Sequence, residues 1–196
     1  MTRPAVLLLD VMSTLVYDPF QVEMSAFFDL TFDELLALKD PRAWVDFEYG
    51  AIDEATFYAR FFSDRSPIDG PGLKAVARAG YRLLDGIEDL LVDLSRTGVS
   101  MHACSNYPPW YQEVEAATGL SRYLEWSFVS CGLGLRKPDP EFYREVLRRL
   151  GRPAGQCLFV DDRERNVAAA RAVGLDGLRF EHAEQLRAAL GARGLP

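Results

Sequence analysis

Apolar runs of strand length alternate with helical patterns along most of the chain. Five runs have the length and the apolar character of strands, at residues 5–10, 99–105, 126–131, 157–161 and 177–180. Their nearly continuous apolar character indicates burial on both faces, which is typical of strands in a parallel sheet. Strands that alternate with helices at this spacing predict an α/β fold with a doubly wound, five-stranded parallel sheet.

Capping residues and glycines mark the helices between these strands. Helices are predicted at about residues 86–97, 108–118, 140–150 and 163–173. Asp85 and Asp139 stand at the N-cap positions of the first and third helix, where a carboxylate accepts backbone N–H groups. A glycine follows each helix closely, as is common at the C-terminal end of a helix.

The alternation is interrupted after the first strand. Residues 18–83 contain several helix signals and no convincing strand pattern. Thr31 opens a capping box, and Asp40 and Asp53 are predicted N-caps of two further helices. We therefore predict a core domain and an inserted helical cap, which comprise residues 1–17 with 84–196 and residues 18–83.

Polar residues follow the predicted strands at their carboxyl ends. They are Asp10, Ser105 with Asn106, Lys137 just beyond the third strand, and Asp161 with Asp162. Ligands of an open parallel sheet bind at this edge, so these side chains are expected to meet. Asp10 and Asp162 can supply hard oxygen ligands for Mg²⁺. Ser105 and Lys137 can donate hydrogen bonds to phosphate oxygens. The pattern predicts a site for a phosphate group held against a divalent cation.

The segments DVMST, SN, RKPDPEFY and FVDDRERN occur in the order and spacing of four motifs. They are the motifs of the haloacid dehalogenase-like (HAD) hydrolase superfamily, which the whole chain resembles. The resemblance implies a Rossmannoid sheet in which the strand that ends at Asp10 is central. The strands that end near Ser105 and Asp161 would flank it, and a helical C1 cap would follow the first motif.

The resemblance also implies roles for the matching residues. Asp10 matches the aspartate that attacks phosphorus and forms an aspartyl phosphate. Ser105 matches the hydroxyl of the second motif and Lys137 the lysine of the third, and Asn106 joins them in binding the phosphate. These residues would make the protein a phosphatase.

A magnesium site is implied in the same way. Its ligands would be the carboxylates of Asp10 and Asp162 and the backbone carbonyl of Met12. Asp161 and Asn166 match the residues of the fourth motif that surround and support the metal ligand. Mg²⁺ is therefore the expected cofactor.

Met12 departs from the common pattern, which has a second aspartate at this position. That aspartate acts as a general acid and base, a contribution worth about 10²–10⁴-fold in rate. LLDVMSTLVYDPF, FEYGAIDE, SNYPPWY and RKPDPEFY resemble a plant flavin mononucleotide (FMN) phosphatase branch of the superfamily, which has methionine there. This resemblance implies hydrolysis of a small phosphomonoester, FMN or similar. Asp18, Glu48 and Tyr49 are candidate proton donors, although packing or surface roles are favoured for each.

Three other HAD functions are less compatible with the residues. Metal-independent haloacid dehalogenases also lack the second acid, but they have no counterpart of the Asp161–Asp162 pair. Phosphonoacetaldehyde hydrolases need a cap lysine of low pKa, and neither Lys39 nor Lys74 has a sequence context that predicts one. A catalytically silent fold used for binding or regulation would have no need to keep the charged cluster together.

Aromatic residues are frequent in the predicted cap, which needs them for a core of its own. A planar leaving group could also stack on such rings, and Trp110 is the better candidate because it follows the second motif. His102 lies within a buried strand, where a structural role is favoured. His182 is predicted to start a helix.

Composition limits the possible partners and compartment. The net charge of −7 argues against nucleic acid as a partner. Cys104, Cys131 and Cys157 show no metal-binding spacing and fit small core residues in a reducing compartment. No apolar run reaches membrane-spanning length, and the first residues lack a signal-peptide pattern. A cytoplasmic protein that acts on a small-molecule phosphate ester, and not on membranes, is expected.

Overall fold

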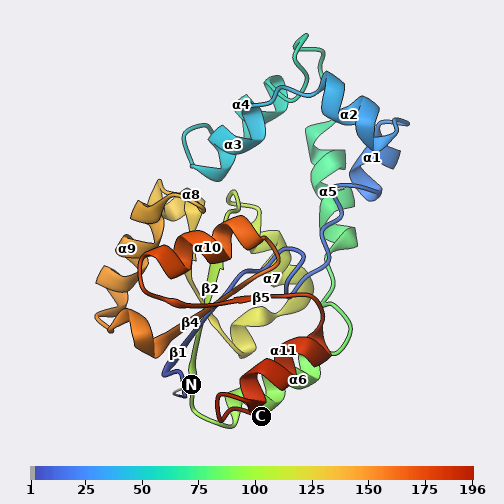
Figure 1. Ribbon diagram of the computed structural model, residues 1–196. Coiled ribbons are helices and arrows are strands. Elements are labelled where there is room, and N and C mark those ends of the chain that lie inside the picture. The colour runs from blue at the N-terminus through green and yellow to red at the C-terminus, as the bar shows by residue number, and fades with distance from the viewer. Residues whose placement is uncertain (1–2) are drawn as a thin grey trace.

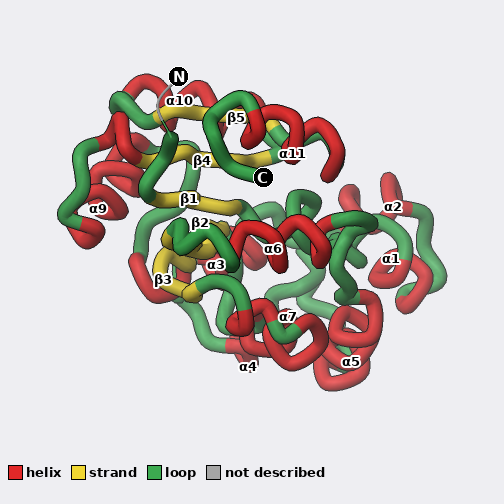
Figure 2. The backbone as a smooth tube through the Cα atoms, turned by 90° about the horizontal axis from the view of Figure 1, so that it is seen from below, coloured by secondary structure: helices red, strands yellow, loops and turns green. Residues whose placement is uncertain are grey.

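The computed structural model describes residues 3–196. Its centre is a sheet of five parallel strands in the order β3-β2-β1-β4-β5 (Figure 2). The strands are β1 (Val6–Leu9), β2 (Ser100–Ser105), β3 (Glu125–Val129), β4 (Cys157–Asp161) and β5 (Asp176–Arg179). The predicted α/β class and the strand order implied by the family resemblance are confirmed, with β1 between β2 and β4.

Alternate residues of the strands enter two separate apolar layers. Leu7 and Leu9 of β1 belong to one layer, and Val6 and Leu8 belong to the other. Burial on both faces explains why these strands show no alternation of apolar and polar residues. One layer contains α6 (Ile87–Ser95), α7 (Tyr111–Thr118) and α11 (Ala183–Gly191), and the other contains α9 (Pro140–Leu150) and α10 (Glu164–Ala172). Shorter connections are α8 (Ser130–Leu133) and the 3₁₀ helices η1 (Leu120–Arg122) and η2 (Ala154–Gln156).

The helix ends of the core agree with the sequence at two of three predicted caps. Asp139 caps α9 by accepting the N–H of Glu141, and His182 caps α11 by accepting that of Gln185. The prediction for Asp85 is wrong. Gly86 is the N-cap of α6, with φ of 76° and no side-chain hydrogen bond. Glycine adopts this left-handed conformation without the strain that other residues would have. The helix therefore begins one residue later than predicted, with Gly86 as its N-cap.

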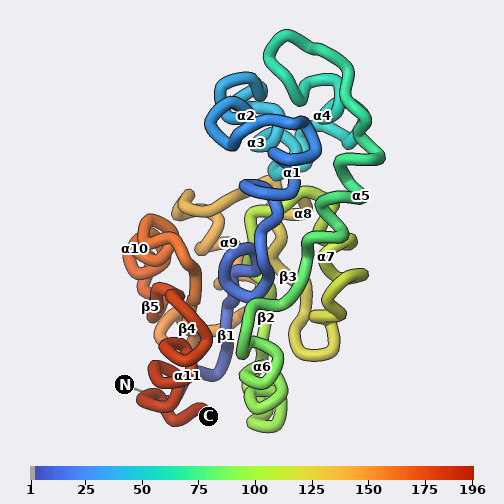
Figure 3. The backbone as a smooth tube through the Cα atoms, turned by 90° about the vertical axis from the view of Figure 1, so that its right-hand side faces the viewer, coloured from blue at the N-terminus to red at the C-terminus, as the bar shows by residue number. Residues whose placement is uncertain are grey.

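The chain between β1 and α6 forms five helices that stand over the carboxyl edge of the sheet (Figures 1 and 3). They are α1 (Glu23–Phe27), α2 (Phe32–Leu38), α3 (Ala43–Glu48), α4 (Glu54–Ala59) and α5 (Gly70–Gly80). The capping box at Thr31 and the cap at Asp53 are confirmed. Asp40 was predicted to be the N-cap of α3, but Arg42 holds that position. The Asp40 carboxylate still accepts the N–H groups of Arg42 and Ala43, from a turn before the helix.

These inserted helices pack on the sheet domain through aromatic side chains and through a close backbone approach. Trp44, Phe47 and Phe57 pack with Trp110, which comes from the sheet domain. A Cβ atom added to Gly50, which has φ of 68°, would lie 2.6 Å from the carbonyl oxygen of Cys131. Only glycine therefore allows this approach. No helix among residues 3–196 is long and apolar enough to cross a membrane.

Candidate active site

Asp10 directly follows the central strand and lies at the base of the site. Its N–H donates to the carbonyl of Val160 at 2.9 Å, which extends the pairing of β1 with β4 by one residue. The chain then turns sharply, with Ser13 at φ of 59° and its N–H bonded to the carbonyl of Val16 at 2.8 Å. Ser13 thus adopts a left-handed conformation that glycine adopts more easily. The turn directs the Asp10 side chain into the site, where the residue is 7% exposed.

Lys137 lies next to Asp10 and is almost completely buried. Its ammonium group is 2.9 Å from Oδ1 of Asp10 and 2.6 Å from Oδ2 of Asp161. The backbone of Lys137 is held by the Asn106 side chain, whose amide group donates to the Lys137 carbonyl and whose oxygen accepts the Lys137 N–H, both at 2.8 Å. Asn106, predicted to bind substrate, therefore positions the lysine, and it also lines the pocket.

Asp161 is fully buried at the end of β4. Besides Lys137, it accepts the side-chain amide of Asn166 at 2.9 and 3.0 Å and the backbone N–H of Arg163 at 2.9 Å. Both oxygens of the Asp161 carboxylate therefore have hydrogen-bond partners within the protein.

Asp10, Asp161 and Asp162 form a cluster that fits a divalent cation. One carboxylate oxygen from each lies within 4.8 Å of the others. Oδ1 of Asp162 is buried and has no hydrogen-bond partner among residues 3–196, so it is a free oxygen of the kind that Mg²⁺ takes. Three carboxylates beside one ammonium group also leave an excess of negative charge, which a divalent cation would balance.

Burial and mutual repulsion raise the pKa values of this cluster. Burial raises the pKa of Asp10 to about 7, against the opposing effect of Lys137 and with the help of Asp161 and Asp162. The pKa of Asp162 is also raised, first by burial and then by Asp161. Burial alone would lower the pKa of Lys137, but the carboxylates of Asp10 and Asp161 outweigh it and raise this pKa. The lysine therefore stays charged, while Asp10 is ready to exchange a proton near neutral pH.

The Ser105 hydroxyl is a second unsatisfied group at this edge. It lies at the end of β2, and its Oγ is buried without a hydrogen-bond partner among residues 3–196. A buried hydroxyl without a partner costs roughly 1–3 kcal/mol. A phosphate oxygen would provide the missing acceptor.

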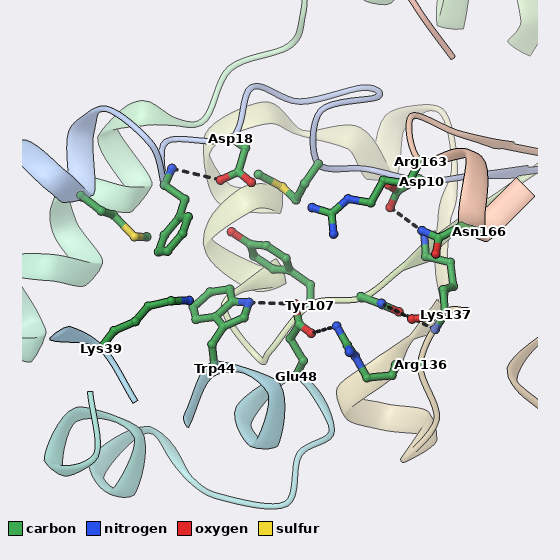
Figure 4. A pocket seen from close by; sticks show the side chains of 14 residues that line it. Asp10, Asp18, Lys39, Trp44, Glu48, Tyr107, Arg136, Lys137, Arg163 and Asn166 are labelled. Atoms are coloured by element: carbon green, nitrogen blue, oxygen red, sulfur yellow. Dashed lines mark hydrogen bonds and ion pairs between the residues drawn. The ribbon is translucent and has the colours of Figure 1, made fainter. Parts of the chain in front are cut away.

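A cavity of about 200 Å³ opens above these residues, between the sheet domain and the inserted helices (Figure 4). Asp10 and Lys137 lie at one end of it, and Lys39 lies at the other, next to the Trp44 ring (Figure 4). Asp18 and Glu48 line the cavity, whereas Tyr49 does not. The lining residues are Asp10, Met12, Asp18, Phe20, Met24, Lys39, Trp44, Glu48, Asn106, Tyr107, Arg136, Lys137, Arg163 and Asn166.

Burial changes the pKa of three charged groups that line this cavity. It raises the pKa of Asp18, and it raises that of Glu48 although Arg136 acts in the opposite direction. It lowers the pKa of Lys39, with Glu48 opposing it. The sequence context of Lys39 contained no signal of this lowered pKa, because the burial that causes it arises only in the folded protein. The lysine nevertheless lies at the end of the cavity away from Asp10 (Figure 4).

Trp110 was predicted to contact a planar leaving group, and the structure places it elsewhere. The side chain is 1% exposed, packs in the aromatic core of the inserted helices and donates its N–H to Glu54. Trp44 is the tryptophan that lines the cavity. His102 hydrogen-bonds Ser100 and Ser127, each at 2.8 Å, in agreement with a structural role.

The sequence analysis did not select several lining residues as parts of the site, among them Arg136, Arg163, Lys39 and Trp44. Arg136 and Arg163 are adjacent to Lys137 and Asp162, so the rule that placed those residues at the sheet edge could also have found the arginines. Lys39 and Trp44 lie in the inserted helices, where the helical pattern alone contains no signal of which face meets the sheet domain.

Comparison with known proteins agrees with this geometry. Residues 32–174 match the haloacid dehalogenase-like hydrolase family. The chain is 45% identical over 190 residues to flavin mononucleotide hydrolase 1, a chloroplast protein of Arabidopsis thaliana, and this match covers 97% of the chain and 78% of the relative. It is 32% identical over 167 residues to a sesquiterpene phosphatase of Aspergillus oryzae, covering 76% and 80% of the two chains.

A solved structure has the same fold. It is a HAD family enzyme of Bacteroides thetaiotaomicron in complex with magnesium and inorganic phosphate, with a TM-score of 0.77 at 18% identity over 90% of this chain and 94% of that one. The chain belongs to the haloacid dehalogenase-like hydrolase family. Its fold and its buried cluster of carboxylates and lysine are those of a magnesium-dependent phosphatase of that family.

Proposed function

We propose that the protein hydrolyses a small phosphomonoester, with FMN as the substrate. The observation that carries this proposal is the placement of the Asp10 carboxylate against Lys137 and the Asp161–Asp162 pair at the base of the cavity. FMN is chosen because the Arabidopsis relative is named for FMN hydrolysis. The two sequences are 45% identical over 97% of this chain.

Residues 18–83 are proposed to form a cap over the active site, and residues 1–17 with 84–196 to form the core. Support comes from the cavity, whose lining combines residues of both segments. The cap separates the bound ester from bulk water, which strengthens the electrostatic interactions within the site.

The reaction proceeds in two displacement steps. An oxygen of the Asp10 carboxylate attacks phosphorus, the bond from phosphorus to the ester oxygen breaks, and the alcohol leaves after it takes up a proton. Water then attacks the phosphorus of the aspartyl phosphate, which releases inorganic phosphate and restores the carboxylate. Lys137 holds the phosphoryl group and reduces its repulsion from the carboxylates, and the Ser105 hydroxyl and Asn106 amide contribute hydrogen bonds.

The carboxylates of Asp10 and Asp162 and the carbonyl of Met12 are the residues that would hold Mg²⁺. Bound there, the ion would neutralise charge on the phosphoryl oxygens. Asp161 and Asn166 keep the lysine and the end of β4 in place around this site.

A phosphatase screen with Mg²⁺ tests the proposal. FMN, sugar phosphates, 2-phosphoglycolate and an aryl phosphate are compared at equal concentration by release of inorganic phosphate. The highest kcat/KM is expected for FMN among the alkyl esters. Asp10→Asn serves as the control for contaminating phosphatases. Turnover of none of these esters by the folded, magnesium-loaded protein would overturn the proposed activity, and a clear preference for another ester would overturn the substrate.

A further inference from the structure

Arg136 brings a second cation into the cavity next to Lys137. The guanidinium group is bound by the carboxylate of Glu48, with Nη2 of Arg136 2.6 Å from Oε2 of Glu48 (Figure 4). Glu48 is the last residue of α3, and Arg136 belongs to the loop that follows α8. This ion pair therefore joins the inserted helices to the sheet domain inside the cavity that both of them line.

Glu48 is held in place from several sides. Its side chain is 8% exposed, and its second oxygen accepts the indole N–H of Trp44 at 2.7 Å. Its backbone carbonyl accepts the hydroxyl of Ser130, in α8 of the sheet domain, at 2.6 Å. A carboxylate fixed in this way has one orientation, so it also restricts the guanidinium group that it binds.

Arg136 has more hydrogen-bond donors than Glu48 uses. A guanidinium group offers five N–H donors in a planar fork. Glu48 is the one hydrogen-bond acceptor of this side chain within residues 3–196, and Nε is buried without any acceptor there. The side chain is 22% exposed, and it lines the cavity. Donors are thus left over for a ligand.

A phosphoryl group is the ligand that these donors fit best. The ammonium group of Lys137 is already shared between Asp10 and Asp161, so a phosphate dianion needs further donors. Arginine binds phosphate through paired N–H groups, and Arg136 is the neighbour of Lys137 in the chain. We infer that Glu48 is a positioning residue, which holds the Arg136 guanidinium group so that it donates to a phosphoryl oxygen of the bound ester.

This inference rests on the proposed phosphatase function and adds a consequence to it. Because Glu48 comes from the inserted helices, the second phosphate-binding cation is correctly oriented only while these helices are docked on the sheet domain. Docking and phosphate binding are then linked through one ion pair.

The test uses Glu48→Gln, Arg136→Met and the double variant of the full chain, loaded with Mg²⁺. Glutamine keeps the shape of Glu48 and an acceptor for Trp44 but removes the charge that holds Arg136. Asp46→Asn is the matched control, because it removes a carboxylate that binds Arg60 at 2.9 Å within the inserted helices, and neither residue lines the cavity. KM and kcat are measured for an accepted ester, and the affinity for inorganic phosphate is measured by calorimetry.

Arg136→Met is expected to weaken binding of inorganic phosphate and to raise KM by roughly 10- to 100-fold, the effect of losing hydrogen bonds to a charged group. Glu48→Gln is expected to act in the same direction. The double variant should be no worse than Arg136→Met, because Glu48 acts through the arginine. Asp46→Asn should behave like the wild type.

Two results would overturn the inference while the phosphatase assignment stands. One is wild-type phosphate affinity in Glu48→Gln or Arg136→Met. The other is a double variant in which the two losses multiply, since this would make Glu48 a general contributor to docking. A wild-type protein that neither hydrolyses an ester nor binds inorganic phosphate would overturn the proposed function and the inference together.

Discussion

The ammonium group of Lys137 lies 2.9 Å from the carboxylate of Asp10, and the lysine side chain is 1% exposed. An unpaired charge at such depth is strongly unfavourable, so the buried lysine requires a carboxylate partner, and Asp10 and Asp161 both supply one. The two residues come from distant parts of the chain, one after β1 and the other after α8. Their contact therefore depends on the folded sheet, and it ties the chemistry of the site to the stability of the protein.

Replacing Lys137 should test this dependence. Lys137→Met removes the ammonium group and leaves Asp10 and Asp161 as buried carboxylates without it. The free energy of unfolding of the metal-free protein at pH 8, measured in urea, should fall by about 3–5 kcal/mol. Lys74→Met is the control: this lysine also contacts two carboxylates, but it is 31% exposed. Its loss should change the free energy of unfolding by no more than about 1 kcal/mol. Equal effects of the two substitutions would contradict the role given to burial.

Asp10→Asn should remove the activity and leave the fold intact. An amide is a poor nucleophile, so kcat should fall by at least about 10³-fold for every ester that the wild type accepts. Circular dichroism and thermal unfolding check that the variant is folded. Residual turnover near the wild-type rate in a preparation free of other phosphatases would indicate direct attack by water on the ester.

Asp162→Ala should weaken Mg²⁺ binding severely, because it removes a free carboxylate oxygen from the cluster. Calorimetric titration of the metal-free variant with Mg²⁺ measures this loss. Asp176→Ala is the control. Asp176 lies on β5, its carboxylate binds Arg193, and it is not part of the cluster. Unchanged Mg²⁺ affinity in Asp162→Ala would show that the ion binds elsewhere.

Binding of Mg²⁺ should depend on pH near neutrality. Burial raises the pKa of Asp10 to about 7 in the metal-free protein, so protons compete with the cation below this pH. Affinity is expected to rise as the pH increases from 6 to 8, with release of a proton on binding.

The raised pKa of Asp10 also has a consequence for the stability of the fold. Since the folded-state pKa exceeds the ordinary value of 3.8, Asp10 favours folding at low pH and this contribution is lost as the pH rises through 7.

The pH experiment has a direct control in Asp10→Asn, which cannot exchange this proton. Its Mg²⁺ affinity should be weaker and should vary less between pH 6 and 8. A wild-type affinity that is constant over this range would contradict the assignment of the raised pKa to Asp10.

Met12→Asp should show whether the site lacks a general acid. With no replacement for the missing carboxyl group, the wild type should favour an activated aryl phosphate over alkyl esters such as FMN, because the aryl leaving group needs little protonation. The substitution should then raise turnover of alkyl esters by up to roughly 10²–10⁴-fold. If Asp18 or Glu48, which both line the cavity, already supplies the proton, Met12→Asp should give no gain. Equal losses on aryl and alkyl substrates would show that Met12 belongs to a working arrangement.

Local interactions explain most of what could be predicted from the sequence. Strands buried on both faces must be apolar throughout, which made all five visible within one or two residues of their observed ends. The caps at Thr31, Asp53 and Asp139 are correct because each side chain bonds N–H groups two or three residues along the chain. Prediction failed at Asp85, where the left-handed backbone of Gly86 decides the start of the helix.

The residues at the base of the site can also be predicted from the sequence. Asp10, Ser105 and Asp161 terminate parallel strands, and parallel strands bring their carboxyl ends to one edge of the sheet. The strand pattern therefore predicts that these side chains lie together. Lys137 followed from its position shortly after the third strand.

Only the tertiary structure decided what lies opposite that base. The inserted helices bury their aromatic residues around Trp110 of the sheet domain, in a cluster continuous with the core on one face of the sheet. The helical pattern of these segments does not specify how they dock. Docking depends on the close approach of Gly50 to Cys131 and on the bond from Ser130 to the Glu48 carbonyl. These contacts place Trp44 in the cavity and keep Trp110 out of it. Such contacts join residues far apart in the chain through shape and hydrogen-bond geometry, which leave no periodic pattern in the sequence.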